Sequence, residues 1–198
     1  MIVGFTTKNN AKRCWIMIKY RNHLGSLMSQ LGFKTAVEVG VQQGLFSEQI
    51  LSRWRNGHLF LVDAWESFAK ETYDDSANVS NEQHLLHMRQ TEENLIRFKG
   101  MYTLIKGYSN EVYKQFDDHY FDLVYLDANH SYESVYEDIS LWINKVKHGG
   151  YICGHDYVDG YIQNHGQFGV KSAVKDFFKR DPDFVTLEVW PSWFIKIQ

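Results

Sequence analysis

The sequence predicts an α/β fold, in which a doubly wound sheet of parallel strands ends in an antiparallel pair and follows a helical extension. Two observations carry this prediction. Short apolar runs alternate along the chain with segments whose apolar residues recur at the helical period, which is typical of parallel sheets covered by helices. At the C-terminus, "FVTLEVW" and "WFIKIQ" meet across Pro191 and Ser192, a connection too short for a helical crossover, so this last pair must be antiparallel.

Five apolar runs have the length and composition of buried parallel strands. The first ends in a glycine, and the second and fourth end in an aspartate. Between them lie amphipathic segments such as the one that places Val135, Ile139 and Trp142 on one helical stripe. The five runs are "TAVEVG" (35–40), "HLFLVD" (58–63), "MYTLIKG" (101–107), "FDLVYLD" (121–127) and "GYICG" (150–154).

Length and charge limit the classes of function. The chain of 198 residues, with 44% apolar content, has the size of one globular domain over 1–198. Its formal net charge of −3 argues against a general nucleic-acid binder, which must neutralise many phosphates. No apolar run reaches the roughly 20 residues that span a bilayer. Cys14 and Cys153 lie far apart in apolar surroundings, which favours reduced thiols and a cytoplasmic protein with small-molecule partners.

The N-terminal extension, residues 1–34, has an unusual charge pattern. Up to Val37 the chain contains no acidic residue. Organelle transit peptides share this composition, and a basic patch can also bind anions. We expect instead a packed helix with a basic outer face. The basic residues are Lys8, Lys12, Arg13, Lys19, Arg21 and Lys34.

The stretch "AVEVGVQQGLFSEQ" (36–49) has the pattern of a strand, a tight loop and a helix. Gly40 lets the backbone approach a ligand, and the helix that follows presents free N–H groups, with Ser47 as a candidate cap. A pyrophosphate bound at this helix end would be repelled by the carboxylate of Glu38. The loop also lacks the third glycine of dinucleotide-binding loops. It therefore favours a ligand that carries a positive charge.

Asp63 ends the second strand, where an acidic side chain can accept hydrogen bonds from both hydroxyls of a ribose. A cationic ligand with a ribose and no phosphates satisfies both Glu38 and Asp63. S-adenosylmethionine fits this description. The alternative interpretation is that Glu38 and Gly40 only shape the end of a strand.

Five motifs in order resemble a known family: "VEVGVQQG", "LVDAW", "GYSNEV", "FDLVYLDANHSYESVYEDISLW" and "GGYICGHDY". They are similar to the class I S-adenosylmethionine-dependent methyltransferases, and within these to the small-molecule O-methyltransferases of the macrocin and mycinamicin type, which act on macrolide sugars. The resemblance runs from about residue 35 to the C-terminus. It implies a Rossmann-like sheet of seven strands with an antiparallel last strand.

The resemblance also implies which residues hold the cofactor. Ser109 is the weakest of these assignments, because it precedes a helical pattern and is equally well explained as a cap. Asp127 is open to a role as cofactor contact or as metal ligand. By the resemblance and the loop pattern, Glu38, Gly40, Gly44 and Ser47 surround the methionine end, Asp63 binds the ribose, Ala64 and Trp65 flank the adenosine, and Ser109 lies near the adenine.

The chemistry is expected at the ends of the fourth and fifth strands. Methyl transfer to an alcohol is an in-line displacement, so the protein must hold the acceptor oxygen and help to remove its proton. Asp127 ends the fourth strand, His130 follows three residues later, and His155 and Asp156 end the fifth. Because parallel strands bring their carboxyl ends to one edge, we expect these four groups in one pocket.

In the macrolide-sugar enzymes that the chain resembles, the corresponding acids bind magnesium, which holds neighbouring sugar hydroxyls, and the histidine is the general base. The resemblance thus implies Asp127 and Asp156 as metal ligands and His130 as the base. His155 replaces a carboxylate of the family, and imidazole suits softer ions than Mg²⁺. Three possibilities stay open: weaker Mg²⁺ binding, an ion such as Mn²⁺, or no metal, with His155 as an acid, a base or a substrate contact.

The acceptor should be contacted by the two long connections, 65–100 and 156–169, because ligand contacts gather at the carboxyl ends of such strands. The second connection combines glycines with Tyr157, Tyr161 and His165, which favours a mobile lid with faces for stacking. Aromatic and polar groups together suit a sugar or a phenol. The resemblance favours a hydroxyl of a sugar or glycan.

Two other classes of function stay open. A nicotinamide-dependent oxidoreductase has a similar sheet, but Glu38 and the absent third glycine disfavour it. A non-catalytic member of the fold would bind a ligand or partner without turnover. The sequence leaves open the acceptor, the position methylated, and the oligomeric state, a homodimer included.

Overall fold

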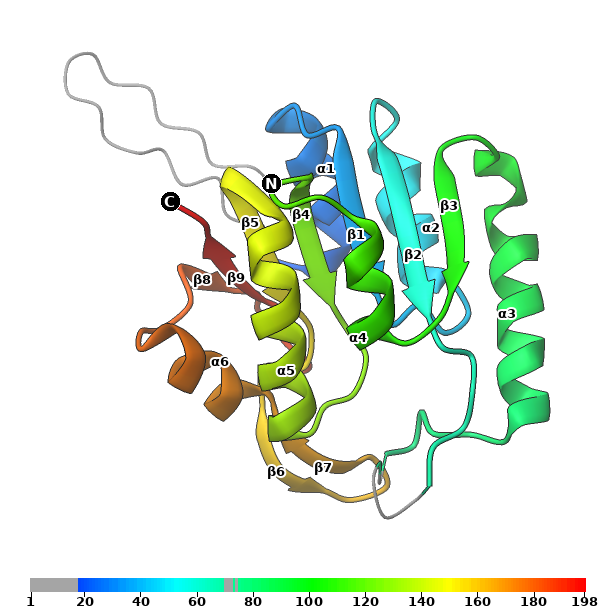
Figure 1. The fold of residues 1–198 in the computed structure, drawn as a ribbon, viewed down its shortest axis with the longest axis vertical. Coiled ribbons are helices and arrows are strands. Elements are labelled where there is room, and N and C mark those ends of the chain that lie inside the picture. Colours follow the sequence, from blue (N-terminus) through cyan, green and yellow to red (C-terminus); the bar gives the residue numbers. More distant parts are fainter. Residues whose placement is uncertain (1–17, 70–72, 74) are drawn as a thin grey trace.

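The computed structural model describes residues 18–69, 73 and 75–198. Its main sheet has seven strands in the order β3-β2-β1-β4-β5-β9-β8 (Figure 1). The first five pair in parallel, and β9 pairs antiparallel with both β5 and β8. The predicted doubly wound sheet with an antiparallel last strand is confirmed. The strands are β1 (Thr35–Val39), β2 (His58–Asp63), β3 (Tyr102–Lys106), β4 (Phe121–Leu126), β5 (Val146–Gly154), β8 (Phe184–Val185) and β9 (Trp193–Lys196).

Helices cover both faces of this sheet (Figure 1). Successive side chains of a strand point to opposite faces, so the strands contribute to two cores. In β4, Leu123 and Tyr125 pack into one core and Val124 and Leu126 into the other. The first core includes α1 (Leu24–Gln30), α2 (Leu45–Arg53) and α3 (Asn81–Leu95), and the second includes α4 (Ser109–Val112), α5 (Tyr132–Trp142) and α6 (Val170–Phe178).

Helix α5 shows how the local sequence sets the structure near the cavity. Ser131 caps its N-terminus, where its hydroxyl accepts from the backbone N–H of Ser134. The predicted apolar stripe is buried as expected. An acid, Asp138, is buried on the same stripe. Single 3₁₀ turns precede α1 or follow α3, α4 and α5: η1 (Arg21–His23), η2 (Ile96–Phe98), η3 (Tyr113–Gln115) and η4 (Ile143–Lys145).

The connection after β5 was predicted as a loop that closes over the acceptor. It instead forms a two-stranded antiparallel hairpin of β6 (Asp159–Ile162) and β7 (Gly166–Gly169), below the carboxyl ends of the parallel strands in Figure 1. Positive φ angles at Gly160 and Gly166 allow the chain to turn sharply there. A backbone bridge between Asp75 and Gly166 ties the hairpin to the connection after β2.

The N-terminal extension is described from residue 18 onward, where it forms η1 and α1. Residues 1–17, which include Cys14 and three of the predicted basic residues, lie outside the described part. Cys153 is a buried free thiol, as predicted. Over the residues that the structure describes, none of the helices has the length and apolar character needed to cross a bilayer.

Gly40, directly after β1, is the point of closest approach between two strand ends. Its φ is +89°, and a Cβ there would overlap the backbone carbonyl of Asp127, directly after β4. The N–H of Asp127 in turn donates to the carbonyl of Val39 at 2.7 Å. Only glycine fits this approach without displacing one of the strand ends.

Substituting Gly40 should therefore lower the free energy of unfolding by more than its positive φ angle alone would. Gly100 has the same φ of +89° but no heavy atom within 4 Å of its Cβ position, so it is a matched control. We expect Gly100→Ala to lower the free energy of unfolding by about 1 kcal/mol. Gly40→Ala should lose roughly 1–3 kcal/mol more through the steric overlap. Equal losses in urea unfolding would contradict the close approach.

Candidate active site

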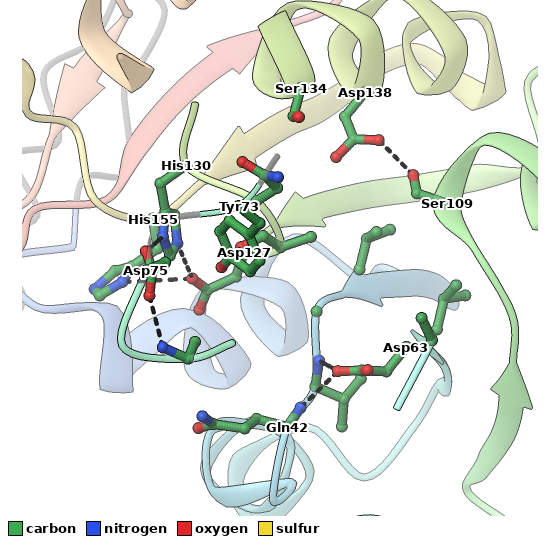
Figure 2. A pocket seen from close by; sticks show the side chains of 18 of the residues that line it. Gln42, Asp63, Tyr73, Asp75, Ser109, Asp127, His130, Ser134, Asp138 and His155 are labelled. Carbon is green, nitrogen blue, oxygen red and sulfur yellow. Dashed lines mark hydrogen bonds and ion pairs between the residues drawn. The ribbon is translucent and has the colours of Figure 1, made fainter. Parts of the chain in front are cut away.

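The carboxyl ends of the parallel strands border a cavity of about 520 Å³, a volume within the range of small-molecule sites. Figure 2 shows two groups of polar side chains in it. His130, His155 and Asp75 gather on one side, and Ser109 and Asp138 lie on the other. The cavity is thus long enough to expose a ligand to two different chemical environments.

Asp63 organises the loop after β1. Its Oδ2 accepts from the N–H groups of Val41 and Gln42 at 2.8 Å each, and its Oδ1 accepts from the N–H of Trp65 at 2.7 Å. A carboxylate offers about four lone-pair positions, so about one is left for a ligand. The prediction that Asp63 accepts from both hydroxyls of a ribose stays a prediction, and its own loop already occupies most of the carboxylate.

Several of the predicted cofactor contacts do not line the cavity. Gly44 is the N-cap of α2, with φ +71°, and packs against Thr91. Ser47 therefore does not cap this helix, and its buried hydroxyl donates to Glu38 at 2.6 Å instead. Trp65 is buried, and its indole N–H donates to the carbonyl of Gln42 at 2.8 Å. The predicted contacts that do line the cavity are Glu38, Gly40, Asp63, Ala64, Ser109 and Asp127.

Glu38 is a buried acid in the cavity wall. Burial raises the pKa of its carboxyl to about 8, against the opposing effect of the hydrogen bond from Ser47. A positively charged group in the cavity would favour the ionised form. In the free protein the carboxyl of Glu38 is therefore largely protonated at neutral pH, and the cationic ligand stays a prediction.

His130 lies at the centre of the acidic cluster. Its Nδ1 is 2.7 Å from Oδ2 of Asp75, and its ring stacks on Phe168. Its Nε2 lies 3.1 Å from Oδ2 of Asp156 and 3.7 Å from Oδ1 of Asp127. Burial disfavours the charged ring, but the interactions with Asp127, Asp75 and Asp156 outweigh it and raise the pKa of His130 to about 10. At neutral pH the imidazole of the free protein is therefore protonated.

Asp127 lies between the guanidinium of Arg21 and two histidines. Its Oδ2 accepts from Nη1 of Arg21 at 3.1 Å, while its Oδ1 faces His130 and His155. Burial would raise the pKa of this carboxyl, but the nearby His130, His155 and Arg21 lower it to about 2. The guanidinium of Arg21 also lies over the ring of Phe46, 4.4 Å from its centroid. The prediction that the basic residues here face solvent is wrong for Arg21.

Three donor atoms of the cluster converge enough to hold a cation. One atom each from Asp127, His130 and Asp156 lies within 4.8 Å of the others. The Nε2 of His130 is buried and has no well-aligned hydrogen bond within the described part of the chain. Ligands about 2.1 Å from one ion lie roughly 3–4 Å apart, and Nε2 of His130 lies 3.1 Å from Asp156 and 3.7 Å from Asp127. An imidazole with two carboxylates suits Mn²⁺ better than Mg²⁺.

His155 belongs to the cluster in a different way from the one predicted. Its Nδ1 lies 2.8 Å from Oδ1 of Asp156, so it contacts this acid from outside the converging trio. His130 takes the third place that the sequence assigned to His155. Asp156 has φ +51°, the left-handed region that residues other than glycine rarely adopt. Such strain is found at functional sites when the surroundings hold it in place.

The three residues that were predicted to contact the substrate lie in different places. His165 lines the cavity and also borders a neighbouring groove. Tyr161 is exposed and contributes only to the groove. Tyr157 lines neither of them, and burial raises the pKa of its hydroxyl to about 12.

Ser109 and Asp138 form the second polar group. The hydroxyl of Ser109 donates to Oδ1 of Asp138 at 2.5 Å and accepts from the indole N–H of Trp142 at 2.8 Å. Tyr108, and not Ser109, is the N-cap of α4, so the interpretation of Ser109 as a cap is wrong. Burial raises the pKa of Asp138 to about 7, although the hydrogen bond from Ser109 lowers it.

The cavity-lining residues that sequence reasoning missed include Arg21, Tyr73, Asp75 and Asp138. Tyr73 reaches the carbonyl of Ala128, and burial raises the pKa of its hydroxyl. Arg21, Tyr73 and Asp75 stand in segments without a periodic pattern. Asp138 could have been found from the sequence, because it lies on the apolar stripe of its helix, where an acidic side chain is buried away from water.

The fold and this cavity define the class: an α/β protein with a cavity of small-molecule size at the carboxyl edge of its parallel strands. The chain belongs to the methyltransferase domain family, whose model, described as "Methyltransferase domain", matches residues 37–157. A comparison with curated protein sequences finds no significant match.

Solved structures share the fold. The chain is 11% identical to the O-methyltransferase TomG from Streptomyces achromogenes in complex with SAM, with a TM-score of 0.62 over 90% of this chain and 79% of that one. For an O-methyltransferase from Bacillus cereus in complex with SAH, the identity is 14% and the TM-score 0.60, over 88% and 78%. A spermidine synthase from Thermotoga maritima also reaches 0.60 at 11% identity, over 88% and 58%. These likenesses therefore show the fold alone.

The buried acid Asp138 predicts a specific pH dependence of stability. The folded state holds a proton up to pH about 7, whereas an exposed Asp loses it near 3.8, so stability falls as pH rises between these values. At pH 8 the cost is on the order of 4 kcal/mol. Asp138→Asn should therefore raise the melting temperature at pH 8 much more than at pH 4. If the melting temperature rose equally at both pH values, the carboxyl of Asp138 would already be ionised in the folded protein at pH 4.

Proposed function

We propose that the protein transfers the methyl group of S-adenosylmethionine to a hydroxyl of a small molecule. One observation carries this proposal: the loop held by Asp63 and the cluster around His130 border the same cavity. The first can bind a nucleoside, and the second can take part in proton transfer. Membership of the methyltransferase domain family supports the reaction type. TomG and the Bacillus cereus enzyme, both O-methyltransferases, support oxygen as the acceptor atom.

The acceptor that we propose is a sugar, free or part of a glycan, as in the macrolide-sugar enzymes. The groove beside the cavity combines two exposed aromatic side chains, Phe68 and Tyr161, with neutral polar side chains. Aromatic faces with neutral hydrogen-bonding groups suit hydroxyl-rich, uncharged molecules. The neutral polar residues of this groove are Ser67, Ser76, Asn78, Ser80 and Asn164.

His130 is the proposed general base. The bond from Nδ1 to Asp75 fixes the orientation of the ring and leaves Nε2 toward the acids that surround the acceptor position. Its raised pKa means that it must first lose a proton before it can accept one from the acceptor. The stack on Phe168 holds the ring while its charge changes.

Asp127 and Asp156 are the proposed ligands of a divalent cation. When bound, such a cation would neutralise the two carboxylates, lower the pKa of His130 and orient neighbouring hydroxyls of the acceptor. Arg21 keeps Oδ2 of Asp127 engaged, so only Oδ1 of this residue faces the cluster. Asp127 thus offers one oxygen in a fixed direction.

The test of the function is methyl transfer from S-adenosylmethionine with a labelled methyl group to a panel of monosaccharides, oligosaccharides and phenols, followed by mass spectrometry. We expect label in a sugar. Calorimetry that detects binding of neither S-adenosylmethionine nor its demethylated product would refute the proposal. Binding of a nicotinamide cofactor in their place would support the oxidoreductase. Cofactor binding with no transfer to any acceptor class would favour a non-catalytic protein.

Replacing the proposed base should separate chemistry from binding. We expect His130→Ala to reduce kcat by about 10²- to 10⁴-fold, because the acceptor hydroxyl loses its proton acceptor. The affinity for S-adenosylhomocysteine and for Mn²⁺ should stay within about threefold, as His130 is the base and not a ligand. Loss of Mn²⁺ binding, measured by electron paramagnetic resonance, would instead assign Nε2 as the third metal ligand.

Removal of divalent ions should abolish activity if the acids act through a cation. After treatment with a chelator, we expect both Mg²⁺ and Mn²⁺ to restore turnover, because the two proposed ligands, Asp127 and Asp156, bind through carboxylate oxygens. Asp156→Asn should weaken this restoration. Full activity of the chelated protein would remove the cation from the mechanism.

A further inference from the structure

Arg21 brings a positive charge into the cavity from outside the residues that match the family model. It lines the cavity but precedes the matched range, residues 37–157. Its Nη1 donates to Oδ2 of Asp127 at 3.1 Å, and its guanidinium lies over the ring of Phe46. The side chain of Arg21 is 29% exposed and that of Asp127 is 17% exposed. This ion pair is therefore largely withdrawn from water.

The backbone at Arg21 is held by the connection between β8 and β9. The N–H of Arg21 donates to Oε1 of Glu188 at 2.8 Å. Two residues earlier, the carbonyl of Lys19 accepts from the N–H of Leu187, also at 2.8 Å. These bonds join two segments that lie on either side of the matched range in the sequence. Arg21 thus reaches Asp127 from a position that another part of the chain holds.

The carboxylate of Asp127 would have to serve two positive groups once a cation is bound. The guanidinium of Arg21 is on Oδ2, whereas Oδ1 faces the cluster in which the proposed cation would bind. Like charges on one carboxylate repel each other, and the repulsion grows as water is excluded. Arginine stays charged at every working pH, so it cannot relieve this repulsion by losing a proton. The bond from Arg21 therefore opposes the binding of a cation at Asp127.

We propose that Arg21 lowers the affinity of the acidic cluster for its divalent cation, by holding Oδ2 of Asp127 and by repelling the cation across this carboxylate. Arg21 acts through Asp127 as a positioning residue and does not itself contact the cation. The consequence is a cation that exchanges with the solvent instead of staying bound between turnovers. The inference rests on the cation of the proposed function.

The test is a titration of the whole chain with Mn²⁺ alone, in which electron paramagnetic resonance measures the free ion. We expect Arg21→Gln to bind Mn²⁺ at least about tenfold more tightly than the wild-type protein, because a neutral amide can donate to Asp127 without repelling the ion. Arg21→Met removes both the charge and the donor, and should also tighten binding. Arg21→Lys keeps the charge and should stay within about threefold of the wild-type affinity.

Arg97→Gln is the matched control. Arg97 also pairs with a carboxylate, that of Glu48, but it lines neither the cavity nor the groove. Because exposed charges are screened by salt, this substitution should leave the Mn²⁺ affinity unchanged within about twofold. Circular dichroism checks the fold of each variant. If Arg21→Met does not fold, the affinity of Arg21→Gln decides.

The direction of the change separates this role from a purely structural one. If Arg21 only held Asp127 in place, its replacement would weaken Mn²⁺ binding, and that result in folded Arg21→Gln would overturn the inference. An unchanged affinity would overturn it as well. If neither the wild-type protein nor the Arg21 variants bound Mn²⁺, the proposed cation would fail and the inference with it, whereas label transfer to a sugar would leave the proposed methyl transfer intact.

Discussion

The site depends on the close approach of two strand ends, at Gly40 after β1 and Asp127 after β4. The strands pair in parallel, and no side chain fits between the two backbones at this point. The loop that follows Gly40 is held by Asp63, and the acidic cluster begins with Asp127. Because the strand ends touch, the loop proposed to bind a nucleoside and the cluster proposed to transfer a proton share one cavity. The sheet thus sets the geometry in which the two parts of a methyl-transfer reaction can meet.

Charge divides this cavity into two kinds of environment. Around His130 the acids Asp75, Asp127 and Asp156 face positive partners, and Arg21 adds a second cation to the cluster. These charges are largely compensated within the protein. Glu38 and Asp138, by contrast, are buried acids whose hydrogen bonds come from the hydroxyl groups of serines. Burial outweighs these hydrogen bonds and raises the pKa of both carboxyls, to about 8 for Glu38 and about 7 for Asp138.

Much of the fold and the centre of the site could be predicted, because both follow from local patterns. Strand ends are visible in the sequence, and parallel strands bring them together. Arg21 and Asp75 could not be predicted, since they reach Asp127 and His130 across 106 and 55 residues of chain. Trp65 was predicted to flank the adenosine, but it does not line the cavity. Its backbone adopts φ +42°, and its side chain is buried behind the loop.

The central claim is that one cavity orients a single cofactor, with its reactive end toward the acidic cluster. A crystal structure with bound S-adenosylhomocysteine tests this most directly. We expect the homocysteine end beside Glu38 and Gly40, the ribose at Asp63 and the purine on the side of Ser109. A cofactor bound in the reverse direction, with its purine against His130, would contradict the account.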